Sequence, residues 1–293
     1  MLRSFYDCAM SRKIVLYIYT TSSLACLMLS YGGLPPIFEA FRLLVAVTFA
    51  GYGIYFFNDL CDLKDDLKNF ELGNPSQANR PLLRGTVSEG DLIKFTCIAS
   101  LIGLVSALSI NVSVFFAITL YLVLGFLYSQ EPIRLKRRFV SKQLINASGH
   151  ALTVLSGALV LGVITAPIIF LIAINFAISM GVNPLMDLRD LRGDKAMGLK
   201  TIPVVLGPRV AVNFALATVI SILAASVVGY ARLGFNLTLP ILSTIILSAM
   251  IFTFYPLIKK WNEPAYVNIV MIKKFMPMYI ALQLITVIGI LKI

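Results

Sequence analysis

Long apolar stretches recur along the whole chain and are separated by short polar segments. They predict nine membrane-spanning helices, at residues 13–34, 42–59, 92–110, 112–128, 143–165, 167–186, 210–231, 237–258 and 275–291. Each stretch is close to the roughly 20 residues that a helix needs to cross the hydrocarbon core of a bilayer. The segments between them are too short for a sizeable extramembrane domain. We therefore expect an all-α, multi-pass integral membrane protein with a single domain over residues 1–293.

The composition agrees with this pattern and excludes a soluble domain. The chain is 58% hydrophobic and 13% charged, with a mean hydropathy of +0.87, whereas soluble domains carry about 25% charged residues. The four cysteines show no CxxC spacing, so neither a disulfide framework nor a zinc site is expected. No AxA-like cleavage site precedes the first predicted span, which argues against a removable signal peptide.

The net charge of +11 is explained by its distribution along the chain. With nine spans, 22 of the 25 Lys and Arg residues fall on one side of the membrane, and only Arg42, Arg232 and Lys292 fall on the other. Basic loops stay in the cytoplasm, so the N-terminus and the basic loops are expected there, most simply in a prokaryotic cell membrane. The basic charge then reflects membrane topology and contact with lipids, and no nucleic-acid partner is predicted.

The acidic residues are concentrated in two matching motifs. Residues 59–66 and 187–194 both read D-L-x-D-L-[KR]-x-D, and each follows the predicted cytoplasmic end of a span. Such a recurrence suggests an internal repeat of spans 1–4 and 5–8. In a helix, positions i, i+3 and i+7 share one face. The predicted stripes are Asp59, Asp62 and Asp66 in the first motif, and Asp187, Asp190 and Asp194 in the second.

The neighbours of these stripes extend the prediction. Asn58 lies one turn from Asp62, and Asn183 lies one turn before Asp187, so both amides join the stripes. Asp65 points away from the first stripe and is expected to be solvated. Clustered carboxylates repel one another without a counter-ion, and oxygen ligands without His or Cys favour Mg²⁺. The six stripe aspartates are therefore candidate catalytic residues, and together with Asn58 they are candidate metal ligands. Solvated helix ends paired with nearby Lys and Arg are the alternative.

Basic residues in the same loops could bind an anion. We expect Arg80, Arg134, Lys136 and Lys195 to contact phosphate oxygens, with Asn58, Tyr128 and Asn183 also binding substrate. A second set of basic residues is assigned to membrane topology alone, namely Arg137, Arg138, Lys142 and Arg209. Carboxylates for metal and cations for phosphate together make a site for a diphosphate bound through Mg²⁺.

These motifs resemble those of a known family. Asn58-Asp59-x-x-Asp62-x-x-x-Asp66 and Asp187-x-x-Asp190-x-x-x-Asp194 match the two aspartate motifs of the UbiA superfamily of intramembrane prenyltransferases. Further resemblances to that superfamily lie at Asn79-Arg80-Pro81, at Tyr128-Ser129-x-x-Pro132-x-Arg134-Leu-Lys136-Arg137 and at Gly193-Asp194-Lys-x-x-Gly198-Leu-Lys-Thr-Ile-Pro203. They cover nearly the whole chain.

The resemblance implies nine helices around a central cavity, with both acidic stripes at its cytoplasmic mouth and a lateral opening for lipids. It further implies Mg²⁺-dependent transfer of a polyprenyl group from a donor such as geranylgeranyl diphosphate. Ionisation to an allylic cation releases diphosphate, and a lipophilic acceptor, an ether-lipid glycerol phosphate or a quinone-precursor ring, captures the cation. A secondary transporter of an anion or divalent cation is the alternative. Transporters hold charged sites near the midplane, whereas these acids lie at helix ends.

Several aromatic and polar residues within the spans remain open to two interpretations. Tyr52, Tyr55, Phe56 and Tyr128 could favour the cation from the cavity wall, or pack against helices and lipid. His150, the only histidine, faces the same way as Asn146 in the fifth predicted span. The pair could bind the acceptor or remove a proton, or a His–Asn hydrogen bond could hold helices together.

Overall fold

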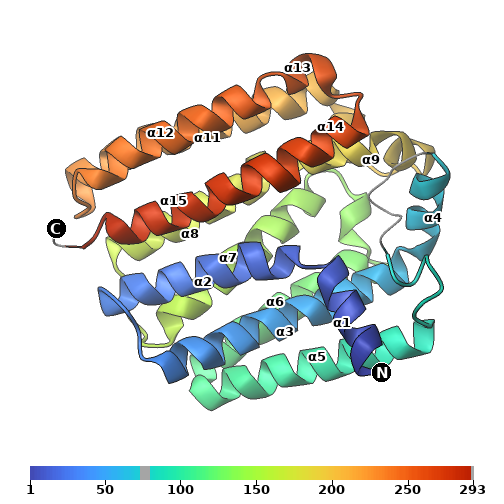
Figure 1. The fold of residues 1–293 in the computed structure, drawn as a ribbon, viewed down its shortest axis with the longest axis horizontal. Coiled ribbons are helices and arrows are strands. Elements are labelled where there is room, and N and C mark those ends of the chain that lie inside the picture. Colours follow the sequence, from blue (N-terminus) through green and yellow to red (C-terminus); the bar gives the residue numbers. More distant parts are fainter. Residues whose placement is uncertain (73–79, 292–293) are drawn as a thin grey trace.

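The computed structural model describes residues 1–72 and 80–291, and this part of the chain is helical with no strand. The helices are α1 (Leu2–Ser11), α2 (Ile14–Tyr31), α3 (Ile37–Cys61), α4 (Leu63–Glu71), α5 (Glu89–Ile110), α6 (Val112–Ser129), η2 (Leu135–Arg137), α7 (Ser141–Leu159), α8 (Ala166–Gly181), α9 (Pro184–Ala196), α10 (Ile202–Val205), α11 (Pro208–Arg232), α12 (Thr238–Phe254), α13 (Leu257–Lys260), α14 (Pro264–Asn268), η3 (Ile269–Phe275) and α15 (Met276–Ile288). Figure 1 shows the long helices lying side by side, with α4, α9 and α13 at one end.

Eight helical stretches in the described residues are long and apolar enough to cross a membrane, so the predicted count of nine is not confirmed. They are Ile14–Tyr31, Ile37–Cys61, Glu89–Ile110, Val112–Ser129, Ala166–Ala196, Pro208–Arg232, Thr238–Lys260 and Pro264–Ile288. The predicted span at 143–165 is the helix α7, which is not among them. It carries many polar side chains, and several of these, including Gln143, His150, Thr153 and Ser156, are buried inside the bundle.

Local signals explain several helix ends. The helix α2 ends at Gly32, whose backbone adopts the left-handed conformation. Glycine commonly ends helices in this way. Asn111 accepts a hydrogen bond from the amide of Val114 and so caps α6. A proline stands in the first turn of α9 and of α11. The last spanning helix begins at Pro264, earlier than the predicted start at Phe275, and includes the π-helical turn η3.

The long helices form a closed circuit. Each helix packs on the next in the order α3, α6, α7, α8, α11, α12, α15 and α2. The circuit closes because α2 also packs on α3. The helix α5 packs outside α3 and α6. At Gly157 of α7 a side chain would lie 2.3 Å from the carbonyl oxygen of Ser23, so α2 and α7 cross in direct contact there.

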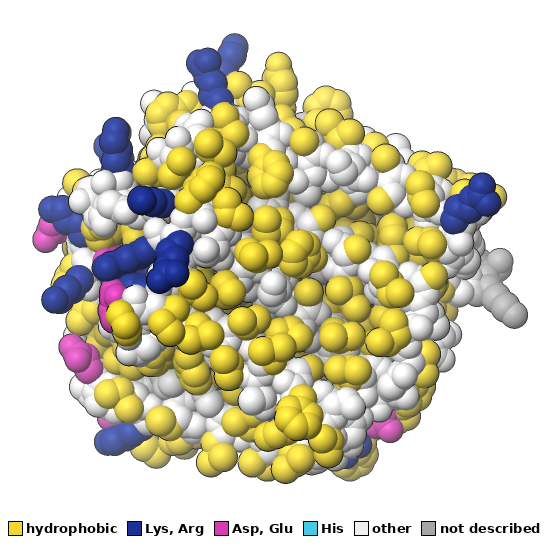
Figure 2. All heavy atoms as spheres, turned by 180° about the vertical axis from the view of Figure 1, so that it is seen from behind, with side chains coloured by type: hydrophobic (Ala, Val, Ile, Leu, Met, Phe, Trp, Pro, Cys, Tyr) yellow, Lys and Arg dark blue, Asp and Glu magenta, His cyan; other side chains and the backbone are white. Residues whose placement is uncertain are grey.

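The N-terminal helix α1 is amphipathic, and the hydropathy pattern did not predict it. Its Phe5 packs edge-on against Phe56 and Phe95 and stacks on Phe49. These contacts fasten α1 across α3 and α5 (Figure 1). Figure 2 shows that on one face of the molecule most Lys and Arg side chains gather toward one end, while a broad apolar surface covers the middle.

Candidate active site

A cavity of about 760 Å³ lies inside the helix circuit. Residues of α2, α3, α6, α7, α8, α9 and α15 line it, together with the junction between α1 and α2. Charged and amide side chains line one end, among them Arg12, Arg80, Lys142, Asp187 and Arg189. Farther along the same helices the lining changes to aromatic and aliphatic groups. The cavity therefore has a polar mouth and a largely apolar body.

The first acidic motif lies beside the mouth: none of its aspartates is among the described residues that line the cavity, and cations from other elements hold them. Asp59 accepts hydrogen bonds from Arg80 and from Arg12, whose Nε lies 3.1 Å from Oδ2 of Asp59. Asp62 accepts from Asn58 at 2.8 Å, lies 3.2 Å from Nη2 of Arg134 and also pairs with Lys136.

The predicted single helical stripe is wrong for this first motif. The helix α3 ends at Cys61, Asp62 has non-helical backbone angles, and α4 begins at Leu63. The side chain of Asp62 is bonded to Asn58, Arg134 and Lys136, so the three aspartates are brought together across a break in the helix. Tertiary contacts, not helical periodicity alone, set their geometry.

The expectation that Asp65 is solvated is also wrong. Asp65 is buried and lies 2.7 Å from Nη2 of Arg134 and 3.3 Å from Nζ of Lys136. Arg134 is itself buried and has a left-handed backbone, with φ of 32°. Because non-glycine residues rarely adopt this conformation, the surrounding ion pairs must hold Arg134 in place. Asp65 thus anchors two of the predicted phosphate-binding cations.

The titration of Asp66 is strongly perturbed by its surroundings. Burial raises its pKa to about 7, nearby Arg12 opposes the shift, and Asp62 and Asp190 reinforce it. Arg80 contributes a longer ion pair, with Nε 3.8 Å from Oδ2 of Asp66. The influence of Asp190 comes from the second motif, so the two motifs act on each other across the mouth.

The second acidic motif lies on one continuous helix, α9. Pro184 opens α9 after Asn183, so the break precedes the motif. Asp187 is buried and pairs with Lys142 at 2.6 Å and with Gln143 at 3.0 Å, both from α7. The assignment of Lys142 to membrane topology alone is therefore wrong. Lys142 instead neutralises a motif aspartate at the cavity wall.

The remaining acids of the second motif differ from each other. Asp190 pairs with Arg189 at 3.1 Å. Asp194 is buried, and its Oδ2 has no hydrogen-bond partner among the described residues. A buried carboxylate oxygen without a partner is costly. It is therefore the clearest position in the motif for a ligand to satisfy.

A close contact joins the helices that carry the two motifs. The helix α4 packs on α9, and a side chain at Gly193 would lie 1.9 Å from Oδ1 of Asn69. Only a glycine in the second motif allows α4 to approach this closely without Asn69 moving. The proximity of the motifs thus depends on Gly193 as well as on charge.

The predicted substrate-binding residues divide into two groups. Asn58, Arg80, Tyr128 and Asn183 line the cavity, while Arg134 and Lys136 bind the acids beside it. Lys195 does not line this cavity but is exposed beside a separate pocket. The Asn79 of the Asn-Arg-Pro motif lies outside the described residues.

Arg12 is a site residue that sequence reasoning did not select. It pairs with Asp59, lies over the ring of Tyr55 at 5.1 Å, and lines the cavity. Burial lowers the pKa of Arg12, whereas Asp66 and Asp62 favour its charged form. Its position immediately before the first span is equally typical of a topological charge, so the sequence held no distinguishing signal.

The candidate aromatic residues separate by position. Tyr55 and Tyr128 line the cavity, whereas Tyr52 stacks on Phe56 and both pack in a cluster with α1 and α5. Tyr19 and Tyr121 also line the cavity, which the sequence did not predict. The aromatic wall is therefore built from α2, α3 and α6.

His150 belongs to a buried polar network deep in the cavity. Its Nδ1 lies 2.7 Å from Oγ of Ser179, and its Nε2 lies 3.2 Å from Oγ of Ser22 and 3.0 Å from the hydroxyl of Tyr279. These bonds join α7 to α2, α8 and α15. Among the described residues His150 makes no hydrogen bond to Asn146, although both line the cavity. Three hydroxyl partners thus take the place of the His–Asn bond that was one of the two interpretations.

The chemistry of the mouth fits Mg²⁺, although each motif pairs mainly with cations. Within residues 1–72 and 80–291 no group of three or more His, Cys, Asp or Glu is arranged as a metal cluster. The available donors are hard carboxylate oxygens, which Mg²⁺ prefers, and Asp194 offers one that is buried and unpartnered. The surrounding Arg and Lys side chains suit phosphate oxygens.

Comparison with known protein sequences adds independent information. The UbiA prenyltransferase family model matches residues 19–271. The digeranylgeranylglyceryl phosphate synthase of Pyrococcus furiosus is 27% identical over 198 residues, which cover 66% of this chain and 68% of that protein. The chloroplastic chlorophyll synthase of Oryza sativa is 28% identical over 159 residues, covering 52% of this chain and 42% of that protein.

Solved structures share the fold. A UbiA homolog from Archaeoglobus fulgidus, bound to DMAPP and Mg²⁺, aligns with a TM-score of 0.71 at 18% identity and covers 98% of this chain and 100% of its own. A structure described for digeranylgeranylglyceryl phosphate synthase aligns with a TM-score of 0.68 at 19% identity, covering 100% and 99%.

Proposed function

Because the chain belongs to the UbiA prenyltransferase family, we propose that it transfers a polyprenyl group from a polyprenyl diphosphate to a lipophilic acceptor in the membrane, with Mg²⁺ as cofactor. Geranylgeranyl diphosphate is the proposed donor. An ether-lipid glycerol phosphate and a quinone-precursor ring are the two acceptor classes. A relative named for digeranylgeranylglyceryl phosphate synthesis supports the first.

One observation carries this proposal: at the polar end of a largely apolar cavity of about 760 Å³, the two acidic motifs pair with cations that line the cavity, namely Arg12, Arg80 and Lys142. Such a mouth can hold a diphosphate, and such a body can hold an isoprenoid chain. Mg²⁺, when bound, supplies positive charge that stabilises the departing diphosphate. The six motif aspartates and Asn58 are the proposed metal ligands.

Arginine and lysine side chains of the chain help Mg²⁺ to hold the departing diphosphate. Arg80, Arg134 and Lys136 now neutralise Asp59, Asp62 and Asp65. We propose that these cations, with Arg12 and Lys142, also donate to diphosphate oxygens. Fixed positive groups at the position where negative charge develops lower the barrier to ionisation. They need little rearrangement, because neighbouring acids already orient them.

The cavity body protects the resulting allylic cation. Aromatic faces at Tyr55 and Tyr128 favour a cation, and the apolar wall excludes water that would capture it. The acceptor oxygen or ring carbon then forms the new bond to the prenyl cation, and its O–H or C–H bond breaks as the proton passes to the released diphosphate. The buried network around His150 closes this region, and we assign it to helix packing at the cavity floor.

The membrane arrangement completes the proposal. We propose that α7 is the ninth span, because it packs on α2, α6 and α8 inside the circuit and its polar residues face the cavity and neighbouring helices. Residues 1–293 then form one domain with an internal repeat of spans 1–4 and 5–8. The end that carries the acidic motifs and most basic residues faces the cytoplasm, as the basic-loop rule requires.

A secondary transporter is not favoured. Family membership is to prenyltransferases, and the acidic motifs lie at one end of their helices rather than at mid-membrane. Transport of an anion or divalent cation would leave the apolar, aromatic cavity body without a role.

The test is to incubate the purified chain in detergent with geranylgeranyl diphosphate, Mg²⁺ and either a monoprenyl glycerol phosphate or a hydroxybenzoate ring. We expect diphosphate release in step with a prenylated product seen by mass spectrometry, and loss of both on chelation of Mg²⁺. The Asp62→Asn variant serves as the inactive control. Failure to form any prenylated product across donors of different length would contradict the proposal.

A further inference from the structure

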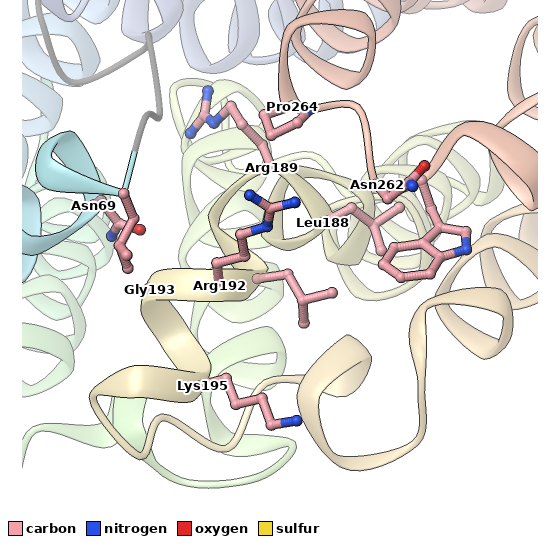
Figure 3. A pocket seen from close by; sticks show the side chains of 11 residues that line it. Asn69, Leu188, Arg189, Arg192, Gly193, Lys195, Asn262 and Pro264 are labelled. Atoms are coloured by element: carbon pink, nitrogen blue, oxygen red, sulfur yellow. The ribbon is translucent and has the colours of Figure 1, made fainter.

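A second, smaller hollow lies on the outer side of α9. It has a volume of about 350 Å³ and is walled by α4, α9 and the segment between α13 and α14. We name it the α9 pocket, and its polar or aromatic lining residues are Asn69, Arg189, Arg192, Lys195, Trp261 and Asn262. Figure 3 shows the three cations following one another along α9, with Asn69 on one side and Asn262 and Pro264 on the other.

The helix α9 carries opposite charges on two different faces. Its acids at 187, 190 and 194 belong to the active-site motif, whereas Arg189, Arg192 and Lys195 recur at every third position and line the α9 pocket. Positions three apart in a helix are neighbours on its surface. Three positive charges are thus gathered at one hollow, and none of the described residues that line it carries a carboxylate.

Ion pairing does not account for all of this positive charge. Arg189 bonds Asp190 and, at 3.2 Å, the side chain of Asn268. Arg192 and Lys195 make no ion pair within the parts of the chain that the structure describes. Topological charges need only face the cytoplasm, but these two border a concave site that also offers the amides of Asn69 and Asn262.

The lining points to a phosphate group. Guanidinium, ammonium and amide groups all donate hydrogen bonds, and phosphate oxygens only accept them. The absence of a lining carboxylate makes the pocket unsuited to a bare cation. Its volume, less than half that of the main cavity, suits a small head group and not a prenyl chain.

The side chain of Arg189 is shared by the two hollows, because it lines both the α9 pocket and the main cavity. A phosphate held by Arg189 in the α9 pocket would therefore lie at the border between them. We propose that the α9 pocket binds the phosphate monoester of the acceptor lipid, apart from the donor's diphosphate. This inference rests on the proposed prenyl transfer and selects a phosphate-bearing acceptor over a quinone-precursor ring.

Trp261 provides a direct binding signal, because it is the only tryptophan in the chain and lines the pocket. The experiment is to titrate the purified chain with a monoprenyl glycerol phosphate, with the same lipid lacking phosphate, and with inorganic phosphate, while recording tryptophan fluorescence. We expect a saturable change with the first, and a midpoint at least about tenfold higher for the other two. A response to inorganic phosphate as strong as that to the phosphate lipid would contradict the assignment to the acceptor, as would equal responses to both lipids.

Variants locate the response. Arg192→Gln and Lys195→Gln, singly and together, should each raise the midpoint for the phosphate lipid roughly ten- to hundredfold, the effect of losing a charge-assisted contact. Arg209→Gln removes an exposed base from the start of α11, outside both cavities, and should leave the midpoint unchanged. Equal midpoints in the wild type and the double variant would overturn the proposal.

Kinetics separate failure of this inference from failure of the proposed function. In the Arg192→Gln and Lys195→Gln variants the KM for the phosphate-bearing acceptor should rise while the KM for the prenyl diphosphate stays at the wild-type value. A rise in the donor KM instead would place these cations at the diphosphate and contradict the proposal. If the wild type forms no prenylated product, the proposed function fails, and the fluorescence titration still decides whether the pocket binds phosphate.

Discussion

The two acidic motifs share a sequence pattern but are built in different ways. The first spans the break between α3 and α4 and is neutralised by Arg12, Arg80, Arg134 and Lys136, which come from three separate segments. The second lies on the single helix α9 and meets Lys142 of α7 and its own arginine. The same spacing of aspartates therefore arises once from tertiary contacts and once from helical periodicity.

This difference shows where each motif is vulnerable. The first should be sensitive to changes in distant cations, because they fix the relative position of its acids. The second retains a buried, unpartnered oxygen on Asp194, so its acids should matter more for binding a ligand than for stability.

The largest effect is expected from removing one of the proposed metal-ligating carboxylates in either motif. Asp62→Asn and Asp187→Asn should each lower the kcat of diphosphate release about 10²- to 10³-fold, the usual effect of losing one group that stabilises transition-state charge. Near-normal turnover in Asp187→Asn with loss in Asp62→Asn would mean that the first motif suffices alone.

A smaller effect is expected from the cations. Arg80→Gln, Lys136→Gln and Lys142→Gln should each lower kcat/KM for the donor roughly ten- to hundredfold, because each loses a charge-assisted contact of about 1.5–3 kcal/mol. The exposed Arg138 provides the matched control, and Arg138→Gln should behave like the wild type. If kcat/KM for the donor fell in Arg138→Gln and stayed normal in the other three variants, the assignment of these residues to phosphate binding, and of Arg138 to membrane topology, would be wrong.

Asp65→Asn should affect stability more than activity. It leaves Arg134 and Lys136, both buried, with one acid fewer, which should cost about 1–3 kcal/mol of unfolding free energy. Its activity should fall less than that of any cation variant. Thermal unfolding in detergent measures the change, with Glu71→Gln, at an exposed surface pair, as the control. An unchanged melting temperature would show that Asp65 does not anchor the cations.

The smallest effect is expected at the contact between the motifs. Gly193→Ala places a methyl group against Oδ1 of Asn69 and should destabilise the protein by about 1 kcal/mol, because the amide can partly turn away. Adding Asn69→Ala should restore stability. Gly90→Ala, where the nearest atom is 3.9 Å from the added carbon, should have no comparable effect. A double variant less stable than Gly193→Ala alone would contradict the steric account.

The sequence predicted the class of fold and the two acidic motifs because both depend on local patterns. Apolar length identifies spans. The break before the second motif coincides with Pro184, although the predicted span at 167–186 ran through that residue. No such residue marks the break at Asp62, whose backbone is set by Asn58, Arg134 and Lys136. The predicted count of nine spans was not confirmed, because α7 carries polar residues that are buried against neighbouring helices and the cavity. These polar residues lower the hydropathy of α7.

Ionic partners were harder to predict than motifs. Lys142 and Arg138 are both basic residues in the same predicted loop, yet Lys142 reaches Asp187 and Arg138 is exposed. Arg12 reaches Asp59 from a helix that the hydropathy pattern did not reveal. Tyr52 and Phe56 pack near Phe5 of that same helix instead of facing the cavity. Such pairings depend on elements far apart in sequence, so they cannot be predicted from the pattern within one segment.

The most direct test of the central claim is a structure of the chain with Mg²⁺ and geranylgeranyl thiodiphosphate, an analogue that ionises slowly. The account predicts one diphosphate at the cavity mouth, with metal ions contacting the acids of the first motif on one side and those of the second, Asp194 included, on the other. A diphosphate bound by one motif alone, with the other more than ~15 Å away, would contradict it, because metal–oxygen bonds of ~2.1 Å cannot bridge that gap.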